Sequence, residues 1–254
     1  MEDAESTRPE DVPEEERALL RHPVWGRVAF YAASAVVIGV LVLLLIPSQG
    51  ARKAARRAHI QYQLKQIGIA LLNYEADYGQ FPPATIADEE GRPMHSWRVL
   101  ILPYLEHTDL HAEYDFDQPW DHPLNLPLLE KTPGVYESPW TSKDDPPGLT
   151  PCVAFSAVGT VLGTTEGAKR ADISQDLSEI PVVVGNFQQP IPWTQPTDIS
   201  PRQWVALHGW MVDNEKYPSV TIQADGSVRA VDLREPPEDL AGRSVIKRRS
   251  SGVP

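Results

Sequence analysis

The chain has 254 residues, a formal net charge of −12 at pH 7 and a hydrophobic content of 41%, which are the values of an ordinary folded domain. The acidic balance excludes a nucleic-acid-binding protein by default, because no basic face is large enough to neutralise phosphates. Cys152 is the only cysteine, so the chain forms no internal disulfide, and we expect this residue to be buried as a small hydrophobe.

Residues 1–27 form an acidic tail that we expect to be disordered. The tail includes the run Glu14-Glu15-Glu16 and few large apolar residues, so it cannot bury enough surface to offset the entropy lost on folding. Its acidic start also differs from the basic start of a secretory signal.

Residues 28–47 are predicted to form a transmembrane helix. The segment Val28–Ile46 carries no charge and extends about 28 Å as a helix, close to the roughly 30 Å of the hydrocarbon core of a bilayer. It continues into Ile46-Pro47-Ser48-Gln49 rather than a small-residue cleavage site, so we expect an anchor that stays uncleaved.

Residues 48–79 are predicted to form an amphipathic helix that continues the anchor, with a bend at Pro47 and Gly50. Apolar residues recur there at alternating steps of four and three, and Gly79 follows the last of them. The pattern covers fewer than three heptads, so packing on a sheet is favoured over a coiled coil. The predicted packing seam is Ile60, Leu64, Ile67, Leu71, Tyr74 and Tyr78.

Residues 80–234 are predicted to form a soluble, β-rich domain with many proline-rich loops. Leu100–Tyr114 is the helical exception, interrupted at Pro103. Asp225 and Gly226 stand between two short apolar runs, which predicts a tight hairpin and therefore an antiparallel sheet. The fold class is α+β, and residues 235–254 are expected to be a disordered tail. The predicted strands are Val153–Val158, Ile180–Val184, Ser219–Gln223 and Val228–Asp232.

A metal site is one hypothesis for the segment after the interrupted helix. His107 and His111 are four residues apart, a spacing that can present two imidazoles to one ion. Asp115, Asp117 and Asp121, with Asn125, offer oxygen ligands, so calcium is the alternative metal. The glycine-centred pattern of an EF-hand is absent, and surface histidines with acidic turns explain the same residues. We expect no cofactor.

Tryptophans are numerous for one small domain. Trp97, Trp120 and Trp193 are candidates for stacking on a ligand or a protein partner, and the alternative is that they fill the core under the loops. We expect no enzyme, because no serine lies in a Gly-x-Ser-x-Gly elbow and Gly159, Gly163 and Gly167 do not form a phosphate-binding loop.

An ordered series of sequence blocks resembles a large family of pseudopilin-like bacterial proteins of unassigned function, which is expanded in planctomycetes. The resemblance covers roughly residues 41–232. The blocks are Leu44–Pro47, Ala51–Arg57, Leu64–Tyr74, Tyr78–Pro83, His95–Val99, Leu102–Glu106, Phe116–Asp121, Ile191–Thr194 and Ala224–Arg229.

The resemblance implies a type IV pilin-like architecture, in which one long N-terminal helix lies half in the membrane and half on an antiparallel sheet. It also implies an anchor in the inner membrane and a periplasmic C-terminal domain. Trp25-Gly26-Arg27-Val28 does not match the usual processing site, and no glutamate lies within Val28–Ile46, so we do not expect filament assembly by the usual route.

The basic residues beside the span give a different indication of topology. Arg17, Arg21 and Arg27 precede it, and the four basic residues of 52–57 follow it, which by the positive-inside rule slightly favours a cytoplasmic domain. The resemblance favours the periplasm, and we expect that orientation, with a single pass through the inner (cytoplasmic) membrane.

Two functions follow as hypotheses. The first is a membrane-anchored, non-enzymatic pseudopilin-like protein that contacts other envelope proteins or homologous subunits, as a component of a secretion or surface assembly. The second is a membrane-tethered binding module for a carbohydrate, a peptide or a metal. Both take the lipid bilayer as a partner, and neither involves nucleic acid.

Overall fold

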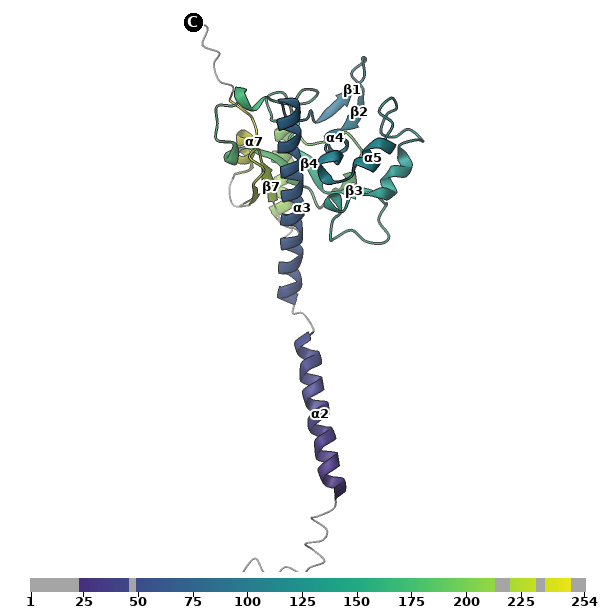
Figure 1. Ribbon diagram of the computed structural model, residues 1–254. Helices are drawn as coiled ribbons and strands as arrows, with labels where there is room; N and C mark the ends of the chain where they lie inside the picture. Colours follow the sequence, from purple (N-terminus) through teal and green to yellow (C-terminus); the bar gives the residue numbers. More distant parts are fainter. Residues whose placement is uncertain (1–22, 46–48, 213–219, 232–235, 248–254) are drawn as a thin grey trace, which may run out of the picture. The chain divides into compact units, whose positions relative to one another are not determined.

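The computed structural model describes residues 23–45, 49–212, 220–231 and 236–247 (Figure 1), with the backbone alone at 23–25, 41–45, 49 and 207–212. The chain divides into two compact units, Met1–Ala54 and Ala55–Pro254. Helices accompany antiparallel sheets, so the α+β prediction is confirmed. The predicted acidic tail before residue 23, the bend at Pro47 and the last residues from 248 lie outside the described residues.

The structure consists of short elements, apart from two long helices near its start. The α-helices are α2 (Pro23–Leu45), α3 (Gln49–Tyr78), α4 (Trp97–Leu100), α5 (Thr108–Glu113), α6 (Pro201–Val212) and α7 (Pro237–Arg243). The strands are β1 (Thr85–Ala87), β2 (Pro93–Ser96), β3 (Leu149–Thr150), β4 (Cys152–Ala154), β5 (Pro181–Gly185), β6 (Ile191–Pro192), β7 (Val220–Gln223) and β8 (Val228–Ala230). Five 3₁₀ turns join the described elements: η1 (Leu102–Leu105), η2 (Leu126–Lys131), η3 (Gly134–Tyr136), η4 (Arg170–Asp172) and η5 (Leu177–Glu179).

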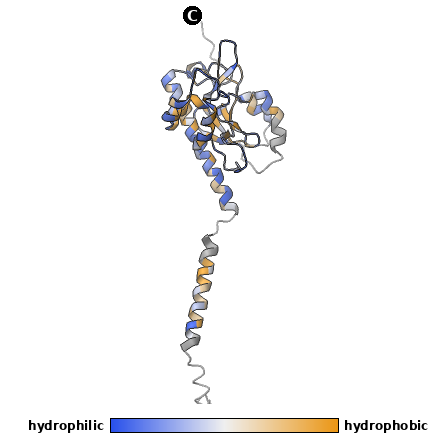
Figure 2. Ribbon diagram, turned by 90° about the vertical axis from the view of Figure 1, so that its right-hand side faces the viewer, coloured by the Kyte–Doolittle hydropathy of each residue, from blue (hydrophilic) through white to orange (hydrophobic). Residues whose placement is uncertain are grey.

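Helix α2 contains most of the segment predicted to cross a membrane. Its described side chains are mainly hydrophobic (Figure 2), and residues 41–46 of the predicted span lie outside the described side chains. Within the described residues, no helix has both the length and the apolar character that crossing a bilayer requires. The transmembrane assignment therefore stays a prediction.

Helix α3 confirms the predicted amphipathic helix. Four seam residues, Ile60 to Leu71, are at most 2% exposed and belong to the main core. Burying each such side chain contributes about 1.5–3 kcal/mol. Tyr74 is half-buried at the edge of this core, whereas Tyr78 is exposed and stacks on the ring of Tyr74 at 4.3 Å. The seam therefore ends one turn earlier than its spacing predicts.

The central sheet has four strands in the order β4-β5-β7-β8, all antiparallel. Alternate residues of β4 point to opposite faces: Cys152 and Ala154 join the core that includes the α3 seam, while Val153 joins a second core with Trp204 of α6 and Leu240 of α7. Strands β4, β5 and β7 are thus buried on both faces, whereas the edge strand β8 is partly exposed. Each of the four predicted strands overlaps one of these observed strands, although two predicted end residues, Ser219 and Asp232, lie outside the described residues.

The predicted hairpin is confirmed between β7 and β8. Gly226 has a φ of +74°, which a residue without a side chain adopts at little cost, and its N–H donates to Gln223 O at 2.9 Å. The Asp225 carboxylate accepts from the N–H of Ser227 at 2.9 Å. Turn chemistry accounts for both predicted turn residues.

The expectation of a disordered end from residue 235 is wrong for residues 236–247. Pro237 begins α7, whose Leu240 and Ala241 pack into the second core, and Ile246 is buried in the main core. Helix α6, in the same second core, was also not predicted. These short helices are stabilised by tertiary burial rather than by a long local pattern, so the sequence alone did not reveal them.

Gly68 of α3 allows the helix to approach the hairpin. A Cβ at this position would lie 2.7 Å from Gly226 O and 3.1 Å from Cγ2 of Ile222. We predict that Gly68→Ala lowers the free energy of unfolding by about 1–3 kcal/mol, because the backbone oxygen must move and this outweighs the better helix propensity of alanine.

Urea unfolding of the full chain, followed by tryptophan fluorescence, measures this change. Gly242→Ala is the matched control, since Gly242 is also helical and has nothing within 4 Å of the added Cβ. The control should be neutral or slightly stabilising. A Gly68→Ala variant as stable as the control would contradict the close approach.

Candidate functional site

The residues of the metal hypothesis lie around a loop that Asn125 holds together. Asn125 is fully buried, its side-chain oxygen accepts from Asp115 N, and its Nδ2 donates to Asp115 O, Gln118 O and Pro119 O at 2.9–3.1 Å. The Asp115 carboxylate accepts from the N–H of Asp117 at 2.9 Å. Both oxygen-bearing side chains therefore stabilise the loop itself.

The predicted ligands do not converge on one point. In the described part of the chain, no three His, Cys, Asp or Glu side chains are grouped as a metal site requires. His107 precedes the first turn of α5, the ring of His111 packs against Phe116 with centroids 5.0 Å apart, and Asp121 is exposed. The structure thus gives no support to the metal and calcium hypotheses for these residues.

The buried His95 ring makes two hydrogen bonds that the sequence did not predict. It is buried between the Tyr114 hydroxyl, 3.1 Å from Nδ1, and Phe116 O, 3.0 Å from Nε2. A carbonyl only accepts, so Nε2 carries the proton and Nδ1 accepts from Tyr114. Burial lowers the pKa of His95, which keeps the ring neutral in this arrangement.

Two of the three tryptophans proposed to contact a ligand are core residues. Trp97 and Trp193 are both 0% exposed, so neither ring presents a surface on which a ligand can stack. Trp97 begins α4 and its indole N–H donates to Asp198, whereas Trp193 stacks with Tyr136 at 6.0 Å. The prediction that Trp97 and Trp193 contact a ligand or a partner at the surface was therefore wrong. Trp120 is partly exposed, and its role stays a prediction.

A buried ion pair between Arg98 and Asp198 lies beside Trp97. Arg98 is 0% exposed, and its Nη2 donates to Asp198 Oδ1 at 2.7 Å. Its other N–H groups donate to Cys152 O and Ser96 Oγ, each at 2.7 Å, and to Gln195 O at 3.3 Å. The guanidinium thereby connects α4, β4 and the segment before α6.

Among the described residues, the hydrogen-bond donors to the Asp198 carboxylate all meet one of its two oxygens. Oδ1 accepts from Arg98, from the Ala154 N–H at 2.7 Å and from the Trp97 indole at 3.2 Å. Burial raises the pKa of Asp198, and the Arg98 charge with these donors opposes the rise. Because the guanidinium stays charged and three donors meet one oxygen, the carboxylate form is favoured.

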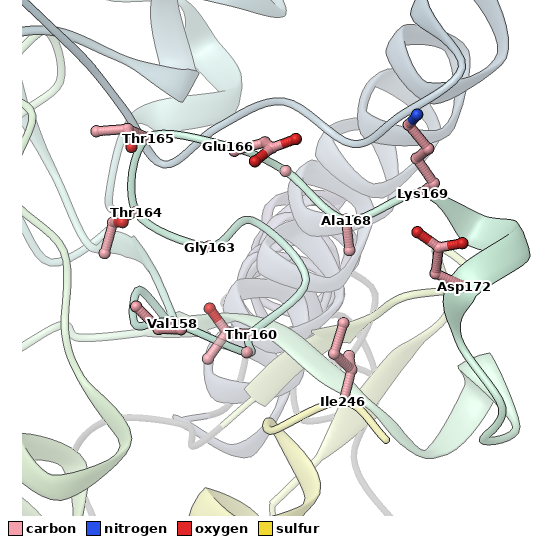
Figure 3. A pocket seen from close by; sticks show the side chains of 12 residues that line it. Val158, Thr160, Gly163, Thr164, Thr165, Glu166, Ala168, Lys169, Asp172 and Ile246 are labelled. Atoms are coloured by element: carbon pink, nitrogen blue, oxygen red, sulfur yellow. The ribbon is translucent and has the colours of Figure 1, made fainter. Parts of the chain in front are cut away.

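A polar pocket of about 300 Å³ lies along residues 158–169, near Ile246. In Figure 3, Thr164 and Thr165 lie at one end of this loop and Lys169, with Asp172, at the other. The side chains of Thr164, Glu166 and Lys169 are exposed to solvent. Hydroxyls, carboxylates and an ammonium group around one hollow suit a polar ligand rich in hydroxyl groups.

Two of the glycines spaced by four shape this pocket. A Cβ on Gly163 would lie 2.0 Å from Glu166 O, and one on Gly167 would lie 1.8 Å from Phe81 O. Gly163 also has a φ of +58°. The spacing of these glycines therefore reflects a tightly folded loop. It was the one feature of the sequence that could have indicated this pocket, which the sequence analysis did not predict. Nothing local indicated the Arg98–Asp198 pair.

Comparison with known proteins identifies one family. Residues 49–198 match the family described as "Protein of unknown function (DUF1559)". No curated protein and no solved structure matches the chain. The matched range begins at α3 and ends at Asp198, so it includes the α3 seam and both partners of the buried ion pair.

We predict that stability falls as the pH is lowered, in part through His95. The pKa of His95 in the folded protein lies below its ordinary value of about 6.5, so between the two values the unfolded chain binds more protons. Stability is therefore complete above about pH 6.5 and decreases below it. Urea midpoints of the full chain between pH 7.5 and 5.0 measure the effect.

His95→Gln should reduce this pH dependence while lowering stability at pH 7.5. Some dependence should remain, because burial also lowers the pKa of His111. The exposed His59 provides the control, and His59→Gln should leave the profile unchanged. An identical pH profile for wild type and His95→Gln would refute the assignment.

We predict that Arg98→Met lowers the free energy of unfolding by about 3–5 kcal/mol, because it leaves a buried carboxylate without its counter-charge. Lys131→Met is the matched control: it removes the exposed partner of Glu113 and should cost about 1 kcal/mol or less. Urea unfolding at pH 7.5 compares the two. Equal, small losses would show that the buried pair is not structurally important.

Proposed function

The chain belongs to the DUF1559 family, and we propose that it is a membrane-anchored, non-enzymatic protein that acts through protein contacts at the cell envelope. The proposal takes α2 as the anchor and the unit Ala55–Pro254 as the part that meets partners. The observation that carries it is the exposure of apolar side chains on α2.

Apolar residues of α2 are exposed on every side of the helix. The exposed fraction runs from 50% at Val40 to 69% at Tyr31, and the positions are spread around the helix rather than along one stripe. A helix that is hydrophobic all round requires an apolar environment around it. The exposed residues are Val28, Phe30, Tyr31, Val36, Val37, Ile38 and Val40.

Helix length is the second support. The described side chains at residues 26–40 extend about 22 Å, short of the roughly 30 Å of a bilayer core. The sequence continues with Leu41-Val42-Leu43-Leu44-Leu45-Ile46, which supplies the missing apolar length. We therefore propose Val28–Ile46 as the membrane span. The inner membrane and a periplasmic C-terminal domain are proposed from the resemblance to pseudopilin-like proteins alone.

A pilin-like arrangement is part of the same proposal. It is supported by a long helix, α3, whose buried seam shares one core with an antiparallel sheet. The other side of α3 carries exposed Tyr62 and Ile69, seven residues apart and thus on one face. Such a face suits contact with a homologous subunit or another envelope protein, as a component of a secretion or surface assembly.

A second candidate is a membrane-tethered binding module for a carbohydrate or a peptide. The polar pocket along residues 158–169 favours it, because its hydroxyls and charges match a hydroxyl-rich ligand. Binding of glycans by a full chain that co-purifies with no other subunit would favour this function over the first.

The anchor is tested by membrane extraction of the full chain expressed in bacteria. We predict that wild type stays with the membrane at alkaline pH, and that the double variant Val37→Arg, Ile38→Arg is released, because each arginine at a helix centre costs about 2.5–3.5 kcal/mol. Leu124→Arg with Leu126→Arg is the control, since it changes two exposed apolar residues of the soluble domain and should remain bound.

Orientation is read in the same strains from C-terminal fusions. For a periplasmic domain, a fused alkaline phosphatase should be active. A fused fluorescent protein that matures only in the cytoplasm should not fluoresce. Release of the wild type by alkali would overturn the anchor, whereas a fluorescent fusion would leave the anchor and remove the periplasmic assignment.

A further inference from the structure

The start of helix α3 carries four basic side chains on the part of the helix that precedes the main core. All four are exposed to solvent. Among the residues that the structure describes, the salt bridges involve other basic groups, so these four positive charges are available to a partner outside the chain. We call this surface the basic face, and its residues are Arg52, Lys53, Arg56 and Arg57.

The basic face lies on the same side of α3 as the buried seam. Lys53, Arg56 and Arg57 stand seven, four and three residues before Ile60, and these spacings place side chains on one side of a helix. Ile60 is 2% exposed and is the first described residue of α3 that is buried. The side of the helix that packs into the core from Ile60 onward is therefore exposed and basic before it.

The distribution of charge along the chain sets this segment apart. The chain has 35 acidic residues and a formal net charge of −12, yet no acidic residue lies between Glu16 and Glu75. An anionic surface repels the chain as a whole, but exposed charges interact only within about one Debye length, roughly 8 Å. A segment without acidic neighbours can therefore bind such a surface, and the basic face lies in that segment.

The basic face is also close to the proposed membrane span along the chain. Three peptide units join Ile46, at the end of that span, to Gln49, at the start of α3, and they extend at most about 11 Å. Arg52 follows three residues later, about 4.5 Å along the helix. The headgroup layer adds roughly 5–7 Å outside the hydrocarbon core, and long basic side chains extend back toward it. Covalent geometry therefore keeps the start of the basic face near the lipid phosphates.

We infer that the basic face binds anionic phospholipids of the phosphatidylglycerol class, in the leaflet at the C-terminal end of the span. Three of its four residues are arginines, whose planar guanidinium groups pair with phosphate through two parallel hydrogen bonds. Phosphatidylcholine also has a phosphate, but its own quaternary ammonium group compensates the charge. The inference names the lipid class around the anchor, so it rests on the proposed anchor.

The test measures which lipid the full chain retains. The affinity-tagged chain is equilibrated in dodecyl maltoside micelles that contain phosphatidylglycerol and phosphatidylcholine in equal amounts with identical acyl chains, and the eluted lipids are quantified by mass spectrometry. We expect the wild type to retain at least about threefold more phosphatidylglycerol than phosphatidylcholine at low salt. The ratio should approach one in about 0.5 M NaCl, because salt screens exposed charges.

Two variants with the same change in net charge locate the binding. Replacing the four residues of the basic face by glutamine should bring the ratio to about one, and glutamine retains a good helix propensity at these exposed positions. The matched control replaces four exposed basic residues elsewhere in the described chain by glutamine and should keep the wild-type ratio. The control residues are Lys143, Lys169, Arg202 and Lys247.

The outcomes separate this inference from the anchor itself. Retention of both lipids by the wild type without preference would overturn the role of the basic face and leave the anchor. Equal losses of preference in the two variants would also overturn it, because net charge alone would then account for the selectivity. Retention of neither lipid by the wild type would overturn the anchor and the inference together. The wild-type comparison stands even if a variant fails to fold.

Discussion

The buried pair of Arg98 and Asp198 is the interaction on which the irregular part of the fold depends. The domain has few long strands, so many backbone carbonyls lie outside sheet ladders and need donors from elsewhere. Arg98 supplies them to Cys152 O, Gln195 O and Thr197 O, the last at 3.5 Å. A guanidinium has five N–H groups in a rigid plane, and no other side chain can serve as many acceptors at once. An apolar replacement of similar volume could fill the space, but it would leave those carbonyls unpaired.

Asp198 has the complementary role, because its carboxylate accepts hydrogen bonds from donors on several segments. It accepts from the Ala154 N–H, which lies on β4, and from the indole of Trp97, which fixes the largest ring at the start of α4. The next residue, Ile199, pairs with Phe155 in a parallel bridge and packs in the second core. The ion pair thus joins the two cores at the edge of the sheet. Its value lies in fixing one arrangement of chain segments, because the desolvation of both charges offsets much of their attraction.

Local patterns in the sequence predicted the elements whose causes are local. The α3 seam follows from helical spacing, and the β7–β8 hairpin follows from Asp225-Gly226. The ion pair joins residues 100 positions apart, so no window of sequence contains it. Helix α7 is short and is stabilised by packing against Trp204, a contact that exists only after the sheet has formed. The sequence left open whether Trp97 and Trp193 are core residues or surface contacts, because an indole suits both positions equally. The partners that hold them in the core, Asp198 for Trp97 and Tyr136 for Trp193, are far away in the sequence.

The polar pocket and the apolar hollow beside α6 differ in the surfaces that line them. The pocket along residues 158–169 has exposed charges that water already satisfies, so its occupation gains little from any one contact. The hollow beside α6 is lined mainly by apolar side chains, among them Val153, Ile191 and Ile199, so covering it would remove hydrophobic surface from water.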